Sequence, residues 1–147
     1  MEKKKCLLSL SKEEESKYSQ LHIELLQDEI DELMPIEQGE LSLDIRYIYD
    51  NEDTIEVSYF LRSAAGKDAY IRKVEFGIFE KSSNILILSK SYDLTYMGRI
   101  PSMGAKLGSM TVIKNEFGDF EDYENIDVRF INRLEIKHIG DCHQGTN

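Results

Sequence analysis

The sequence predicts a mainly β fold: an antiparallel β-sandwich of six to seven strands with one amphipathic helix near the N-terminus. Apolar and polar residues alternate through residues 41–62, as in strands that bury one face and expose the other. Short polar turns separate further strand-like runs, which is typical of an antiparallel sandwich. No helical pattern stands between these runs, which argues against a parallel α/β fold. The chain has 147 residues and fits a single domain, which we place at residues 1–139.

The N-terminal part predicts a short buried strand at residues 6–10, followed by the helix. Ser11 precedes Glu14 by three residues, which is the spacing of a capping box. Because the residue before a proline avoids the α conformation, the helix should end before Pro35, so we place it at about residues 11–33 and expect it to pack across the sandwich. The apolar stripe of this helix consists of Tyr18, Leu21, His22, Leu25 and Leu26, widened by Ile23, Ile30 and Leu33.

Residues 41–62 predict a long β-hairpin, since the four polar residues 50–53 that interrupt the alternation have the length of a hairpin turn. The continuous apolar run at 85–88 indicates a strand buried on both faces. The last strand should be broken near Asn132. The remaining expected elements are strands at 70–80, 85–92, 107–115 and 126–138, an irregular segment at 93–104, an acidic aromatic loop at 116–125, and a disordered tail at 140–147.

The charge is strongly acidic, with a formal net value of −10. Residues 11–40 alone carry ten acidic and two basic residues. Nucleic-acid binding is disfavoured, because phosphates require a basic surface. Two interpretations of the acidic segment stay open: a solvated helix face, or a docking face for a basic partner.

Export and membrane signals are weak in this sequence. No apolar run approaches the ~20 residues of a membrane helix, and residues 6–10 are shorter than the apolar core of a signal peptide. We therefore expect a cytoplasmic protein without membrane insertion, associated with the membrane or envelope only through partners. In that compartment Cys6 and Cys142 are expected as reduced thiols, although the sequence leaves a disulfide between them open.

Catalytic and metal-binding motifs give little support for an enzyme. The chain has no G-x-S-x-G elbow and no glycine-rich phosphate loop, so we expect no catalytic residue and no cofactor. His22 is interpreted as a partly buried helix residue, and His138 ends the last strand. The cluster 141–143 (Asp-Cys-His) offers three neighbouring ligand types where a zinc site needs four on a rigid frame. The acidic segments 50–53 and 119–124 lack the ligand spacing of an EF-hand. They are nevertheless the basis of the alternative function, which is a small ligand- or calcium-binding protein.

Three stretches carry a resemblance to a known family. They are residues 8–10 with the acidic helix and the turn MPIEQGELS at 34–42, the strand IEVSYFLR at 55–62, and the segment YDLTYMGRIP at 92–101. The sequence resembles the SLAP domain, found in S-layer assembly proteins associated with the accessory Sec system of Gram-positive bacteria. Pro35 and Pro101 stand alone where the family often has a proline pair, Ser63 replaces a usual Asn, and the chain has no Trp.

The resemblance implies an immunoglobulin-like β-sandwich that acts in protein export or S-layer and cell-envelope assembly through protein contacts. It implies no catalytic residue. The candidate contact residues are Tyr96, Met97, Arg99 and Ile100, in the irregular segment. The alternative is that these residues close the end of the sandwich. Because open sheet edges invite pairing with another chain, a homodimer through strand edges is a further expectation.

Overall fold

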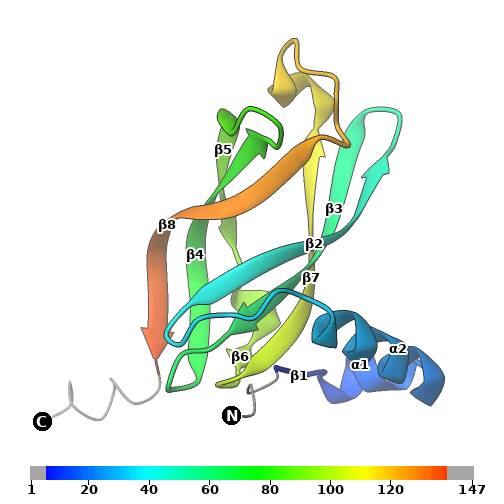
Figure 1. Ribbon diagram of the computed structural model, residues 1–147, viewed down its shortest axis with the longest axis vertical. Helices are drawn as coiled ribbons and strands as arrows, with labels where there is room; N and C mark the ends of the chain where they lie inside the picture. Colours follow the sequence, from blue (N-terminus) through cyan, green and yellow to red (C-terminus); the bar gives the residue numbers. More distant parts are fainter. Residues whose placement is uncertain (1–5, 139–147) are drawn as a thin grey trace, which may run out of the picture.

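Two β-sheets face each other across one hydrophobic core (Figure 1). The computed structural model describes the backbone of residues 6–138 and the side chains of residues 6–132. The first sheet has the strand order β1-β7-β3-β2, with β1 at Leu7–Leu8, β2 at Leu41–Asp50, β3 at Thr54–Ser63 and β7 at Gly104–Ile113. The second sheet contains β4 at Ala69–Glu80, β5 at Ile85–Asp93, β6 at Arg99–Ile100 and β8 at Ile126–His138. The helices are α1 at Lys12–Lys17 and α2 at Gln20–Asp31, with 3₁₀ turns η1 at Thr95–Met97 and η2 at Lys114–Phe117.

The predicted hairpin is confirmed as β2 and β3. The two strands pair antiparallel from Leu41 opposite Ser63 to Asp50 opposite Ile55, with one bulge at Arg46. β3 also pairs with β7 along its whole length, so it is an inner strand of the first sheet. The hairpin therefore supplies the central scaffold of this layer.

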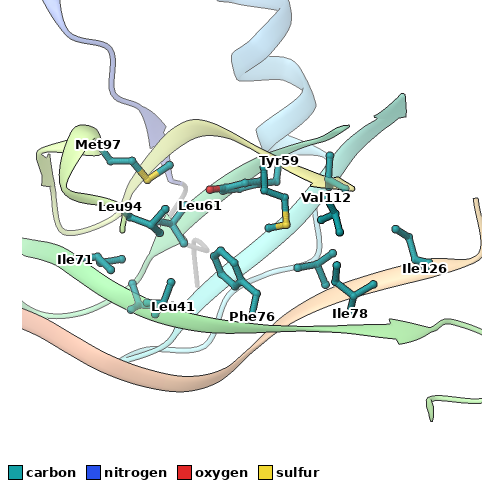
Figure 2. Packing of buried hydrophobic residues seen from close by; sticks show 14 of the residues in the cluster. Leu41, Tyr59, Leu61, Ile71, Phe76, Ile78, Leu94, Met97, Val112 and Ile126 are labelled. Atoms are coloured by element: carbon teal, nitrogen blue, oxygen red, sulfur yellow. The ribbon is translucent and has the colours of Figure 1, made fainter. Parts of the chain in front are cut away.

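The core lies between alternate side chains of β3 and β4, as Figure 2 shows. Tyr59 of β3 and Phe76 of β4 meet edge to face, with ring centroids 6.2 Å apart. This arrangement confirms the mainly β prediction. The finer immunoglobulin-like assignment stays a prediction. The fully enclosed residues of the two central strands are Ile55, Val57, Tyr59 and Leu61 on β3 and Ile71, Val74, Phe76 and Ile78 on β4.

The prediction of one helix over residues 11–33 is wrong, because the chain forms two helices there. Ser11 caps α1 with the expected capping box. Tyr18 then adopts an extended conformation, and Ser19 begins α2 by accepting a hydrogen bond from the backbone N–H of His22 at 3.1 Å. A second serine cap inside the apolar pattern interrupts the helix, because its side chain satisfies an N–H group that a continuous helix would bond to its own backbone.

The apolar stripe of the helix is narrower than predicted. Leu26 and Ile30 are buried, and α2 packs them on the outer face of the first sheet near Phe60. Leu21 and Leu25 are 66% and 52% exposed. His22 is exposed too, so the interpretation of it as partly buried is wrong. In Figure 1 the helices lie beside the β1 end of the sheet, far from the turn between β2 and β3.

The strand at 85–88 is present, but its predicted burial on both faces is wrong. Ile85 and Leu86 are 63% and 48% exposed. Among the strands that the structure describes, β5 pairs only with β4, so it is an edge strand with a neighbour on one side. A continuous apolar run indicates burial only where further strands or helices cover both faces.

The last strand, β8, runs along β4 on the side opposite β5 and β6. Its register with β4 shifts around Asn132, near the predicted break. No helix within the described part of the chain is long and apolar enough to cross a membrane. The predicted tail at 140–147 lies outside the described residues, as do Cys142 and the cluster 141–143.

Candidate functional site

The segment between β5 and β7 is held by a side-chain turn at its start. The Oδ1 atom of Asp93 accepts hydrogen bonds from the backbone N–H of Thr95, at 2.8 Å, and from the Thr95 hydroxyl. Both bonds favour the charged carboxylate, so they lower the pKa of Asp93. This turn starts η1 and fixes the direction of Tyr96 and Met97.

The four candidate contact residues divide into two groups. Met97 and Ile100 are 6% and 0% exposed and belong to the core, as the alternative interpretation expected. Tyr96 is 65% exposed, and Arg99 is also exposed and lies 3.6 Å from Asp68 in an ion pair. Partner contact at these positions stays a prediction, and the exposed area for it lies at Tyr96 and Arg99.

Tyr96 borders a hollow that lies beside β7 and extends across the first sheet to Ser58 of β3 and Arg46 of β2. Two adjoining cavities of about 260 and 250 Å³ share Glu14, Tyr96 and Leu107 in their walls. We call the two together the β7 groove. Its lining residues come from the α1 region (Ser11, Glu13, Glu14, Lys17, Tyr18), from η1 (Tyr96, Met97), from β2 and β3 (Arg46, Ser58), and from β7 (Lys106, Leu107, Gly108, Ser109).

Lys106 is a residue of this groove that the sequence interpretation missed. It is 8% exposed and takes part in no ion pair or hydrogen bond among the described residues. The available signal was strand alternation, because Lys106 has the same parity as the core residues Met110 and Val112. Lys106 therefore lies on the same face of β7 as Met110 and Val112, which is the face that turns toward the core.

Gly108 forms the floor of the groove over Tyr59. A Cβ atom at position 108 would lie 2.6 Å from the Tyr59 ring and 2.6 Å from Cε of Met97. The Tyr59 hydroxyl is buried close to the Tyr96 side chain, and burial raises the pKa of this phenol. Figure 2 shows the Met97 side chain pointing toward the oxygen end of Tyr59. A glycine inside a strand pattern was the sequence signal for this close approach.

The acidic hairpin tip is tied into the scaffold. Lys114 Nζ lies 2.5 Å from Oδ1 of Asp50, and this hydrogen bond raises the pKa of Lys114. In the second acidic segment, Phe120 stacks on the buried Phe117, and Tyr123 meets Phe117 edge to face. Within residues 6–132, no three His, Cys, Asp or Glu side chains are grouped to hold a metal ion.

Cys6 is buried beside Arg62 and Asp44, under α2. Burial raises the pKa of its thiol, which favours the protonated form at neutral pH. This cysteine is therefore part of the packing between β1, α2 and the first sheet.

A comparison with protein families matches residues 8–110 to the SLAP domain, well over half of the chain. The chain belongs to the SLAP domain family. The match begins in β1 and ends in β7, so it includes both helices, the central hairpin and the Tyr96 segment. Comparisons with curated proteins and with solved structures found no match. At the level of the family, the SLAP domain points to a role associated with the S-layer and the accessory Sec system.

Proposed function

We propose that this SLAP domain is a non-enzymatic protein-interaction module that serves as an accessory factor in protein export or in S-layer and cell-envelope assembly. The observation that carries the proposal is the family match over residues 8–110. We place the protein on the cytoplasmic side, where it would reach the membrane or envelope through its partners.

The architecture supports a binding role. The β-sandwich is a rigid scaffold, and its exposed features are of the kind that contact proteins: an acidic helical segment, an exposed tyrosine on a fixed turn, and a groove along a strand edge. These features lie together, since Glu14 of α1 and Tyr96 of η1 line the same cavity.

The test is affinity capture with the full-length chain as bait, in a lysate of a Gram-positive bacterium that carries an accessory Sec system. We expect enrichment of an export ATPase or an S-layer or envelope component relative to an unrelated acidic β-domain of similar size. Recovery of the same proteins on both baits, or of no export or envelope component, would contradict the proposed role.

The alternative function, calcium or small-ligand binding, has a separate test. Titration calorimetry with calcium chloride would give binding heat and a raised melting temperature if the acidic segments formed a site. No heat and no change in melting temperature would remove this alternative and leave the interaction role.

A further inference from the structure

We propose that the open edge of β7 at residues 107–109 binds an extended segment of another protein as an added β-strand, and that an acidic side chain of this segment pairs with Lys106. The proposal rests on the protein-interaction role proposed above, but it does not depend on the link to export.

The first argument is the backbone edge itself. β3 pairs with one side of β7 from Gly104 to Ile113 without a register shift. On the other side, β1 contacts only the start of β7: the backbone N–H groups of Leu7 and Ser9 donate to the carbonyl oxygens of Met103 and Ala105, at 2.9 and 2.8 Å. The chain then leaves the sheet to form α1.

Residues two apart in a strand direct their backbone groups to the same edge. Since the carbonyl of Ala105 faces the β1 side, the N–H and C=O groups of Leu107 and Ser109 face that side as well. No described strand pairs with them there. Further along, the carbonyl of Thr111 accepts a bond of 3.5 Å from the Tyr92 hydroxyl. The unpaired stretch is therefore short and lies at the β7 groove.

The second argument is the shape around this edge. Glu14 and Tyr18 of the α1 region and Tyr96 of η1 all contribute to the walls of the groove. A second copy of this chain would bring its own α1 region and Tyr96 along the same edge, and these groups crowd the approach of two backbones. A single extended segment fits between the walls, and its alternate side chains would face α1 and Tyr96.

The third argument is the unpaired charge of Lys106. Other charged groups in the groove walls have partners: Lys17 lies 4.0 Å from Glu13, and Arg46 forms a two-point contact with Glu29. Lys106 is nine-tenths buried and has no such partner in the described part of the chain. A carboxylate entering the groove would compensate this buried cation. That requirement selects an acidic side chain in the added strand.

An inward-facing charge on an edge strand can also serve to prevent aggregation between sheets. The two roles of Lys106 make different predictions. If it only protects the edge, its replacement increases self-association and leaves peptide binding unchanged. If it recognises the added strand, its replacement weakens binding of acidic peptides.

The experiment starts with the full-length chain immobilised against a displayed library of random peptides of about ten residues. We expect enrichment of alternating sequences with a central Asp or Glu. A selected peptide is then resynthesised with backbone N-methyl groups on every second residue. Two peptides are compared, one methylated at its odd-numbered residues and one at its even-numbered residues. One of them should bind about tenfold more weakly or worse, and the other should bind nearly as before, because only one edge of the peptide forms hydrogen bonds with β7.

The charge is tested with Lys106→Met, which keeps the apolar stem. We expect this variant to bind the acidic peptide about tenfold more weakly and to bind the amide analogue, with Gln for Glu, as the wild type does. Lys81→Met is the matched control, since Lys81 is exposed in the turn between β4 and β5. It should leave both affinities unchanged.

The proposal is overturned if no alternating peptide is enriched, if binding is insensitive to both methylation patterns, or if Lys106→Met self-associates while peptide affinity stays the same. A protected β7 edge in a dimer of the wild-type chain would also overturn it. Groove-dependent peptide binding together with failed capture of export components would support this groove and count only against the export role.

Discussion

Arg62 is buried on the outer face of β3, where its positive charge is compensated by an ion pair with Asp44 of the neighbouring strand β2. Nε of Arg62 lies 2.8 Å from one carboxylate oxygen of Asp44, and Nη2 lies 3.3 Å from the other. The hydroxyl of Ser42 donates a further bond to Asp44. This two-point contact fixes the geometry of the pair, and it is the kind of interaction whose loss leaves an uncompensated buried charge.

Removal of the Asp44 carboxylate should therefore destabilise the fold strongly. We expect Asp44→Ala to lower the free energy of unfolding by about 3 kcal/mol, measured by urea denaturation. The matched control is Glu13→Ala, which breaks an ion pair whose side chains are 84% and 67% exposed and should cost less than about 0.5 kcal/mol. Equal losses in the two variants would contradict this account of Arg62.

Asp93 should make stability depend on pH in the acidic range. Its pKa in the folded chain lies below its unfolded value, because Thr95 donates two hydrogen bonds to the carboxylate. A group of this kind stabilises the fold above the unfolded pKa of about 3.9, and the contribution is lost as the pH falls through the folded pKa.

The comparison is between the melting temperatures of the wild type and Asp93→Asn. We expect the wild type to melt higher at neutral pH and the difference to close as the pH falls below about 4. Asp119→Asn serves as the control at an exposed aspartate. A difference between wild type and Asp93→Asn that stays constant with pH would show that the Asp93 turn does not contribute through its charge.

Helix α2 contacts the sheet through only a narrow part of its surface. Leu26 is 1% exposed and packs near Phe60, whereas the adjacent Leu25 is half exposed. Gln27 ties the helix to β1, because it accepts from the backbone N–H of Leu8 and donates to the carbonyl of Cys6. The helix therefore holds β1 against β7, and through β1 it determines where the open edge of β7 begins.

Two neighbouring leucines test this docking. Leu26→Ala should destabilise the chain by about 3 kcal/mol, as expected for a buried leucine that leaves a cavity. Leu25→Ala removes the same atoms from an exposed site and should change the free energy of unfolding by no more than about 0.5 kcal/mol. Similar losses in both variants, measured by urea denaturation, would mean that α2 lies differently on the sheet.

The second sheet and the core are completed by β8, which lies outside the residues that match the family. β8 pairs with β4 from Ile126 to His138 and brings Val128, 0% exposed, into the core. It also lies near β2, where side chains from both strands line a common cavity of about 430 Å³. The matched residues alone thus leave one edge of β4 unpaired and one side of the core uncovered.

A fragment that ends at residue 110 should therefore not fold. We expect residues 1–110 to lack near-ultraviolet circular dichroism and dispersed amide NMR signals. This fragment loses the pairing of β4 with β8 and of β3 with the end of β7, and it loses the core residues Val112, Ile126 and Val128. The control fragment, residues 1–139, should retain both signals. Cooperative unfolding of the shorter fragment would show that the matched region is a folding unit by itself.

The elements of this protein could be predicted from its sequence because their signals are local. Alternation located the β2–β3 hairpin, and the Ser11–Glu14 spacing located the start of α1, since each depends on residues a few positions apart. The family also followed from short stretches of sequence. The break at Ser19 was a local signal too, but the surrounding apolar pattern concealed it.

Exposure and the candidate site required the tertiary structure, because they depend on segments that are distant in the sequence. The run at 85–88 looks buried until β5 is seen at a sheet edge, and Leu25 looks equivalent to Leu26 until α2 is placed on the sheet. The β7 groove exists because side chains of the α1 region and of η1, which are distant in the sequence, come together beside β7. Local patterns state which side chains can share a face, but only packing decides what covers that face.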